Sequence, residues 1–194
     1  MPRIDNEQFY KSAIEKHGVS AKGVQWISEK TQQVRFNVIL NILPNDVSDL
    51  VIVDAGCGFG DFYFWMKKKK KLPSKYIGID LLSDMVNIAS KRTKQKIIKA
   101  NICKDKLIDA DYYICSGAMN VLERFETHLF IQNCYNSSKY GFIFNILHGD
   151  KNSETYNYMT TSQIQRIAKN LKITNVKIFS GYLDKDITVG FFKK

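Results

Sequence analysis

The feature that most constrains the fold is a glycine-rich turn between an apolar run and a helical pattern. Residues 50–54 predict a buried strand, and residues 59–71 have the apolar spacing of an amphipathic helix. Between them, glycines alternate at Gly56, Gly58 and Gly60. Glycines allow the backbone to reverse within a few residues and to approach a ligand more closely than a Cβ would permit. This order predicts a ligand site at the carboxyl end of a parallel strand.

Short apolar runs and helical patterns continue to alternate along the chain, which predicts an α/β fold with a doubly wound sheet. Further strands are expected at 75–80, 96–101, 111–115 and 140–147, and helices at 83–93, 122–138 and 161–171. Two last strands, 173–179 and 187–192, have a short link, which predicts an antiparallel hairpin because parallel neighbours need a long crossover.

Two helical stretches, 6–16 and 31–43, precede the sheet, and the second has an apolar face. We therefore expect a single domain over residues 1–194. In it, a helical lid over 1–49 covers a core over 50–194. The core is expected to hold seven mostly parallel strands with helices on both faces.

The composition fits a globular protein. Of 194 residues, 44% are hydrophobic and 25% are charged, which argues against a disordered tail, a collagen-like fibre and a coiled-coil rod. No apolar run approaches the roughly 18 residues that cross a bilayer. No secretory signal is recognised, so we expect a cytoplasmic protein without a membrane partner. Four cysteines without a C-x-x-C pair predict a reducing compartment and no metal site.

The net charge of +10 has two interpretations. Lysines neutralise phosphates, so the charge could mark an RNA-binding surface. The chain is also rich in Lys, Asn, Ile, Phe and Tyr together, which indicates a compositional bias of the source genome. The run Lys67–Lys71 falls at the end of a predicted helix, where cations complement the helix dipole.

Other glycine-rich nucleotide sites do not match the turn. The dinucleotide fingerprint G-x-G-x-x-G/A requires a small residue at Asp61 if read from Gly56, and at Tyr63 if read from Gly58. An acid there would also repel a pyrophosphate. No Gly-Lys-Ser/Thr follows, which excludes a Walker loop. A cationic ligand with a ribose and no phosphate fits better, because Asp80 ends the next strand and can accept both ribose hydroxyls.

Residues 54–60, Asp-Ala-Gly-Cys-Gly-Phe-Gly, and 76–80, Tyr-Ile-Gly-Ile-Asp, together resemble the first two motifs of class I S-adenosylmethionine-dependent methyltransferases. The resemblance spans about residues 50–194. It implies a Rossmann-like sheet of order 3-2-1-4-5-7-6 and S-adenosyl-L-methionine as the cofactor. It further implies that the glycine turn follows the methionine part and that Asp80 holds the ribose.

The third motif departs from that pattern. An Asp usually faces the adenine amine, whereas this chain has Asn101, whose side-chain carbonyl can still accept a hydrogen bond. The link 101–111 is too short for the usual helix. Upstream, residues 17–20 and the Trp26 to Phe36 region resemble a bacterial group of these enzymes. Arg35 is assigned to the cofactor carboxylate because the forked geometry of its guanidinium group suits a carboxylate. A surface ion pair is the alternative.

These considerations predict a set of cofactor-binding residues and no metal. They are Trp26, Gln32, Arg35, Asp54, Ala55, Gly56, Cys57, Gly58, Asp80, Leu81, Asn101, Ile102 and Ser116.

The methyl acceptor is expected to face polar residues that follow the fourth and fifth strands. The predicted catalytic residues are Asn120, Asn145 and His148. Two of them have structural alternatives: His148 as a loop histidine without a catalytic role, and Asn145 as a partner for backbone groups alone. The Asn/Asp-Pro-Pro-Tyr/Phe signature of base-amine methylation is absent. We expect methyl transfer to an oxygen or nitrogen of a small molecule. An RNA methyltransferase and a non-catalytic cofactor-binding module are the alternatives.

Overall fold

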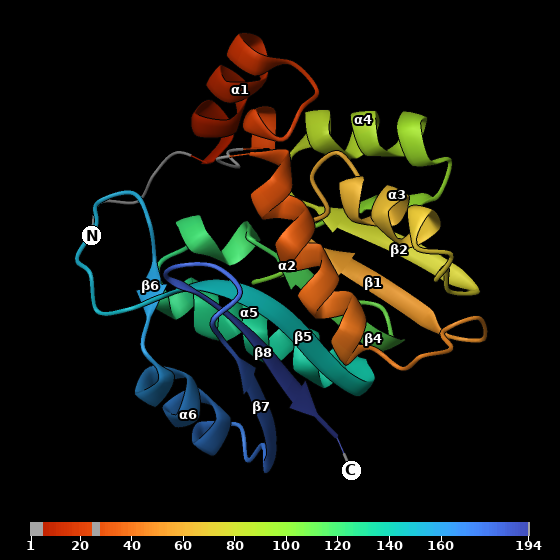
Figure 1. The fold of residues 1–194 in the computed structure, drawn as a ribbon. Coiled ribbons are helices and arrows are strands. Elements are labelled where there is room, and N and C mark those ends of the chain that lie inside the picture. The colour runs from red at the N-terminus through yellow and green to blue at the C-terminus, as the bar shows by residue number, and fades with distance from the viewer. Residues whose placement is uncertain (1–5, 25–27, 194) are drawn as a thin grey trace.

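The computed structural model describes residues 6–24 and 28–193. Its centre is one mixed sheet flanked by helices (Figure 1). The strands are β1 Val51–Ala55, β2 Lys75–Asp80, β3 Lys96–Lys99, β4 Ala110–Ser116, β5 Ser138–His148, β6 Tyr158–Met159, β7 Asn175–Phe179 and β8 Asp186–Phe192. The helices are α1 Asn6–His17, η1 Lys22–Val24, α2 Glu29–Ile42, α3 Asp61–Lys68, α4 Ser83–Thr93, η2 Ala118–Val121, α5 Arg124–Ser137 and α6 Thr161–Asn170.

The strand order is β3-β2-β1-β4-β5-β8-β7, with β6 paired to β5 outside this path. Strands β1 to β5 pair in parallel, whereas β8 is antiparallel to both β5 and β7. Because β8 and β7 are the seventh and sixth long strands, this is the predicted order with the predicted terminal hairpin. The two-residue strand β6 was not predicted, since so short a segment has no periodicity to detect.

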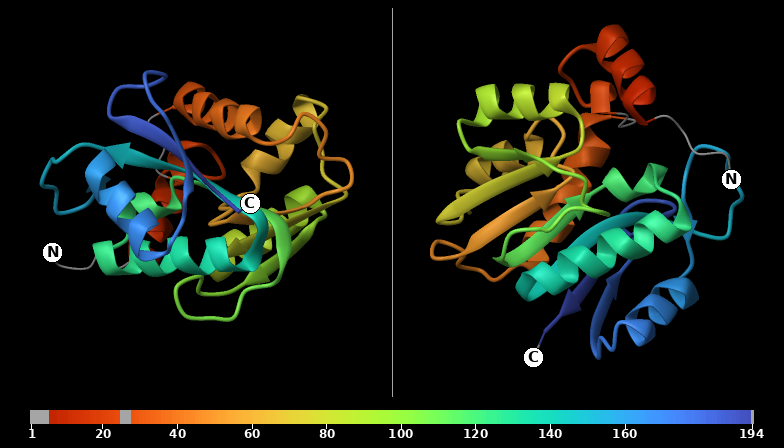
Figure 2. Two further views of the ribbon diagram at one scale, coloured as in Figure 1. Left: turned by 90° about the horizontal axis from the view of Figure 1, so that it is seen from below. Right: turned by 180° about the vertical axis from the view of Figure 1, so that it is seen from behind.

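The two faces of the sheet hold separate apolar clusters. Helices α5 and α6 pack on one face, where Phe130 and Ile164 meet Phe142 and Phe144 of β5. Helices α2 and α3 pack on the other, where residues such as Ile39 contact the strands. Figure 2 shows these two layers of helices from below and from behind. Burial on both faces explains the nearly continuous apolar runs of the central strands.

Helix α2 is part of this core, although it was expected to lie in a lid. Its N-terminus is fixed by a capping box between Ser28 and Thr31, and its face with Phe36, Ile39 and Leu40 is buried against the sheet. Helices α1 and η1 lie over the carboxyl ends of the strands, and the N-terminal half of α2 reaches the same end through Gln32 and Arg35 (Figure 1). The apolar face at 31–43 is a packing surface, as predicted, but it packs on the face of the sheet and not as a lid.

The link between β3 and β4 is a turn and an extended stretch without a helix, as its length predicted. Asn101 shapes the turn, because its side-chain oxygen accepts from the Cys103 N–H at 3.0 Å. The chain then reaches Ala110 of β4 directly. This part of the sheet therefore approaches the ligand site through a short loop.

Candidate functional site

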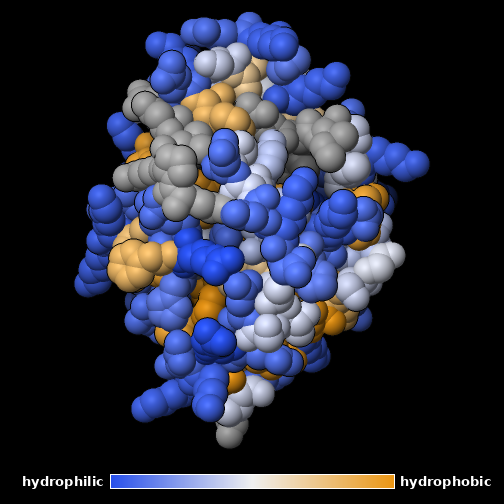
Figure 3. Space-filling view, turned by 90° about the vertical axis from the view of Figure 1, so that its left-hand side faces the viewer, coloured by the Kyte–Doolittle hydropathy of each residue, from blue (hydrophilic) through white to orange (hydrophobic). Residues whose placement is uncertain are grey.

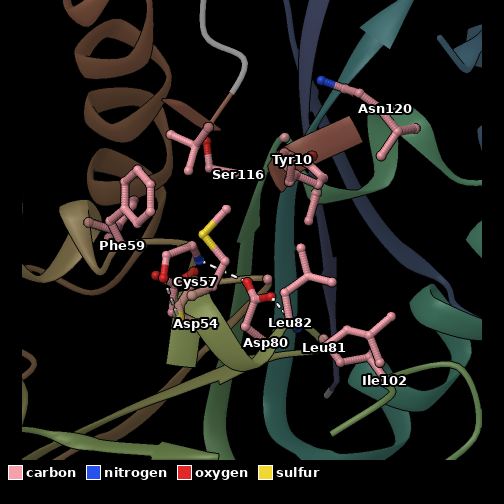
Figure 4. A pocket seen from close by; sticks show the side chains of 18 of the residues that line it. Tyr10, Asp54, Cys57, Phe59, Asp80, Leu81, Leu82, Ile102, Ser116 and Asn120 are labelled. Carbon is pink, nitrogen blue, oxygen red and sulfur yellow. Dashed lines mark hydrogen bonds between the residues drawn. The ribbon is translucent and has the colours of Figure 1, made fainter. Parts of the chain in front are cut away.

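A cavity lies at the carboxyl ends of β1, β2 and β4 (Figure 4). Its walls come from the turn after β1, the end of β2, the loop after β3, the segment from Ser116 through η2, and helices α1 and α2. The predicted residues in its described lining are Gln32, Arg35, Asp54, Gly56, Cys57, Gly58, Asp80, Leu81, Asn101, Ile102, Ser116 and Asn120. The structure therefore brings together residues that are almost ninety positions apart in the sequence.

The glycine turn needs its glycines for two reasons. Gly56, Gly58 and Gly60 have φ of +76°, +53° and +78°, a region that side chains strongly disfavour. A Cβ on Gly56 would also lie 2.3 Å from the Cβ of Ala118, so the turn after β1 packs directly on the segment after β4. The Gly56 N–H donates to the Ile79 carbonyl at 2.8 Å, which ties the turn to β2.

Asp80 is held with its carboxylate toward the cavity. One oxygen accepts from the Gly58 N–H at 2.9 Å and the other from the Leu82 N–H at 3.0 Å, as the dashed lines in Figure 4 show. Burial raises the pKa of Asp80, and these N–H donors oppose the shift. The two contacts fix the side chain while its remaining lone pairs can accept from a ligand.

Asp54 adds a second, more deeply buried carboxyl group. It accepts a hydrogen bond from the Tyr76 hydroxyl. Burial raises the pKa of Asp54 to about 7, with further increases from Asp80 and Asp61 that the Tyr76 hydrogen bond partly offsets. Asp54 and Asp80 together favour a ligand that carries positive charge, whereas the Asp61 carboxylate on the same wall is paired with Arg92 at 2.8 Å.

Arg35 lines the cavity from α2, but its Nε and Nη2 also contact the Asp186 carboxylate in β8. Arg35 is 8% exposed and Asp186 only 3%, so this ion pair is buried and not on the surface. Gln32, one turn earlier, donates to Asp61 at 3.2 Å. The ion pair provides Arg35 with a carboxylate from the protein, so its contact with a cofactor carboxylate remains a prediction.

Other predicted residues lie elsewhere. Trp26 is outside the described residues. Ala55 is fully buried in β1 and is not in the described cavity lining. Asn101 and Ile102 line the cavity, while the Asn101 carbonyl already accepts from the Cys103 N–H.

The expectation that Asn120, Asn145 and His148 share one mouth needs correction. Asn120 lines the cavity, and its side-chain oxygen accepts from the Leu147 N–H at 3.1 Å. The other two are not in the described lining. The reason is geometric: Asn145 points to the sheet face under α2 with no exposed area, and His148, the last residue of β5, lines a separate surface pocket with residues 180–186. There the His148 ring lies 3.3 Å from the Thr161 hydroxyl.

Two tyrosines line the cavity that the sequence did not assign to it. Tyr10 enters from α1, and Tyr156 from the loop before β6. Burial raises the pKa of the Tyr10 hydroxyl, and Asp80 and Tyr156 raise it further. No local pattern marks either residue, because each reaches the cavity only through the path of a loop or lid in three dimensions.

Comparisons with known proteins agree with this geometry. Residues 52–141, from β1 into β5, match the family model described as a methyltransferase domain. No curated protein sequence matches the chain.

Solved structures share the fold at low identity. Magnesium protoporphyrin IX methyltransferase from Synechocystis PCC 6803, with bound S-adenosylmethionine, aligns over 100% of both chains with a TM-score of 0.71 and 13% identity. An S-adenosylmethionine-dependent methyltransferase from Mesorhizobium loti is 18% identical, with a TM-score of 0.61 over 81% of this chain and 96% of that one. A possible histamine N-methyltransferase from Thermotoga maritima is 17% identical, with a TM-score of 0.62 over 84% and 88%.

The cavity fits S-adenosylmethionine chemically. The glycine turn lines the cavity with the backbone of Gly56 and Gly58. Asp80 presents a fixed carboxylate at the end of β2. The acidic wall suits a sulfonium ion. Residues 52–141 match the methyltransferase-domain family, and the chain has the Rossmann-like fold of solved S-adenosylmethionine-dependent methyltransferases.

Proposed function

We propose that the protein is an S-adenosylmethionine-dependent methyltransferase and that it methylates an oxygen or nitrogen atom of a small molecule. The observation that carries the proposal is the composition of the cavity wall, which Tyr10 and Val24 from the N-terminal helices line together with Asn120 and Tyr156. A cavity lined by side chains from two separate segments beyond the strand ends favours a small acceptor over a folded macromolecule.

The charge of the cavity wall supports the same choice. Its described lining contains Asp54 and Asp80, Asp61 paired with Arg92, no lysine, and Arg35 paired with Asp186. Such a wall repels a phosphate backbone, because like charges at close range are unfavourable. The net charge of +10 keeps an RNA methyltransferase as the second candidate.

In this proposal the cofactor lies along the strand ends. Asp80 accepts from the ribose hydroxyls, Gly56 to Gly58 follow the methionine part, and Asn101 and Ile102 border the adenine. When bound, S-adenosylmethionine supplies a methyl group already activated by its sulfonium. The protein then contributes mainly positioning, which can lower a barrier by several kcal/mol, up to roughly 7–11 in ideal cases.

The residues around the acceptor act as orienting groups. Burial raises the pKa of Tyr10, so its hydroxyl keeps its proton at neutral pH and can donate a hydrogen bond. Asn120 is held by the Leu147 N–H beside the same space. His148 lies outside the described lining, so the proposal assigns it no proton transfer.

The test is a transfer assay with methyl-labelled S-adenosylmethionine and a cell extract separated into metabolites below about 3 kDa, RNA and protein. The proposal expects label in the metabolite fraction, and mass spectrometry of the labelled compound identifies the methylated atom. The Asp80→Ala variant serves as the inactive control. Label confined to RNA would establish the second candidate instead.

A further inference from the structure

A chain of hydrogen-bonded polar side chains, four of them buried and two partly buried, connects two residues of the cavity wall along the sheet face under α2. We call it the polar relay. Its members, in order, are Ser116, Asn145, Thr188, Tyr182, Asp186 and Arg35. Ser116 and Arg35 line the cavity, whereas the described lining includes none of the four residues between them. Buried polar groups of this kind are expensive to retain unless each is satisfied.

The strand register brings the members together. Ser116 of β4 is paired with Asn145 of β5, and Asn145 is paired with Thr188 of β8. Asn145 and Thr188 have no exposed area. Because alternate residues point to opposite faces of a sheet, these side chains and Asp186 all face the α2 side, where Arg35 meets them.

Each hydrogen bond of the relay has a defined donor and acceptor, because one member of the relay is a carboxylate. Burial raises the pKa of Asp186, and the contact with the Arg35 guanidinium opposes the shift. A carboxylate paired with a cation can only accept, so the Tyr182 hydroxyl donates to it, at 2.9 Å. The oxygen of Tyr182 must then accept from Thr188, at 2.8 Å.

The same reasoning extends to the cavity. The only hydroxyl proton of Thr188 is used, so Thr188 accepts from the Asn145 amide nitrogen at 2.6 Å. This turns the Asn145 carbonyl toward Ser116, which donates its proton at 2.7 Å. Ser116 therefore offers the cavity lone pairs and no proton.

We propose that the polar relay holds Ser116 and Arg35 as a matched pair, an acceptor and a cation, that recognises the zwitterionic amino-acid end of the cofactor. Thr188, Tyr182 and Asp186 are positioning residues that act through this pair. An ammonium is a donor and a carboxylate an acceptor, so the two ends of the relay present the complementary groups. The inference rests on the assignment of the cavity to S-adenosylmethionine.

Calorimetry with two ligands tests the inference. S-adenosylhomocysteine has the amino-acid end, whereas 5′-methylthioadenosine shares its adenosine and sulfur but lacks that end. Tyr182→Phe and Thr188→Val each remove one hydroxyl from the relay. Each should weaken S-adenosylhomocysteine binding by about 3- to 10-fold, as expected for one hydrogen bond, and leave methylthioadenosine binding unchanged. Thr188→Ser, which keeps the hydroxyl, should restore the affinity.

Tyr113→Phe is the matched control. Tyr113 is a fully buried tyrosine in β4 whose hydroxyl donates to the Ile108 carbonyl at 2.6 Å, outside the relay, and its loss should change neither affinity. Equal weakening of both ligands by the relay variants would indicate a general structural effect and overturn the inference, as would unchanged S-adenosylhomocysteine binding. A wild-type protein that bound neither ligand would contradict the cofactor assignment itself, which is a distinguishable result.

Discussion

At the scale of single residues, carboxyl groups at the strand ends determine what the cavity can bind. Asp80 accepts a hydrogen bond from the glycine turn and also lines the cavity. We expect Asp80→Ala to weaken S-adenosylhomocysteine binding by about 1.5–3 kcal/mol, because charge-assisted hydrogen bonds are lost. Calorimetry measures the change. Asp84→Ala, an exposed acid in the first turn of α4, is the control and should bind as the wild type does.

Asp54 should make stability depend on pH. Its pKa is about 7 in the folded protein against an ordinary value of 3.8. A raised carboxyl pKa contributes stability below the lower value, and that contribution is lost as pH rises through about 7. Asp54→Asn keeps an acceptor for Tyr76 and removes the titration. We expect the variant to exceed the wild type in unfolding free energy by about 1–3 kcal/mol at pH 8, and by less at pH 5.

Urea unfolding at the two pH values measures this difference. The exposed acid Asp49, which precedes β1, provides the control variant Asp49→Asn. A stability difference between Asp54→Asn and the wild type that is the same at pH 5 and pH 8 would show that Asp54 is not the titrating group.

The sequence predicted strand-end residues better than any others. Gly56, Asp80 and Ser116 follow recognisable strands, so their place at one edge of the sheet follows from parallel topology. Asn145 and His148 lie near the end of the fifth strand. Whether their side chains reach the cavity depends on the face of the sheet that each one takes and on the residue at which β5 ends. A shift of one residue moves a side chain to the opposite face, and no pattern in the sequence fixes that detail.

At the scale of elements, α1 is the helix most suited to move. Within the described residues it packs mainly on η1, and it contributes Tyr10 to the cavity. Ligand binding should hold it closed. We expect S-adenosylhomocysteine at ten times its Kd to slow trypsin cleavage at Lys11, Lys16 and Lys22 by roughly tenfold, because cleavage requires local opening.

Limited proteolysis followed by mass spectrometry measures these rates. The Asp80→Ala variant should lose the protection, since it binds the ligand weakly. Protection of α1 that does not depend on the ligand would mean that the helix is a fixed part of the fold.

The long elements were predictable because their patterns are local. Helix α4 matches its predicted bounds, and the terminal hairpin followed from a link too short for a crossover. The role of α2 was not predictable, because an apolar face shows that a helix packs but not on what. The missing helix between β3 and β4 followed from chain length alone.

At the scale of the whole molecule, the excess positive charge lies outside the cavity. The face in Figure 3 is mostly hydrophilic, with hydrophobic residues in small separate areas. Part of the run Lys67–Lys71 serves the fold: Lys71 donates to the Leu40 and Leu43 carbonyls, while Lys68 and Lys69 lie over the Trp65 ring. No helix in the described parts of the chain has the length and apolar character needed to span a bilayer.

We therefore expect only weak RNA binding that depends strongly on salt, because scattered lysines neutralise phosphates without stacking bases. Fluorescence anisotropy with a labelled single-stranded RNA between 50 and 200 mM salt measures it, with affinity expected to fall by about 10-fold or more. Heparin, a polyanion without bases, should compete fully. Tight, sequence-selective binding at the higher salt concentration would favour RNA as the substrate.

The position of β8 also has a consequence for the order in which the protein is made. β7 precedes β8 in the chain but joins the sheet only through it, since β8 lies between β5 and β7. During translation β7 must therefore leave the ribosome without a partner and wait for a strand that is synthesised later. Thr188 and Asp186 arrive with that strand. The strands β1 to β5 can thus assemble first, and the relay residues Thr188 and Asp186 join the sheet after them.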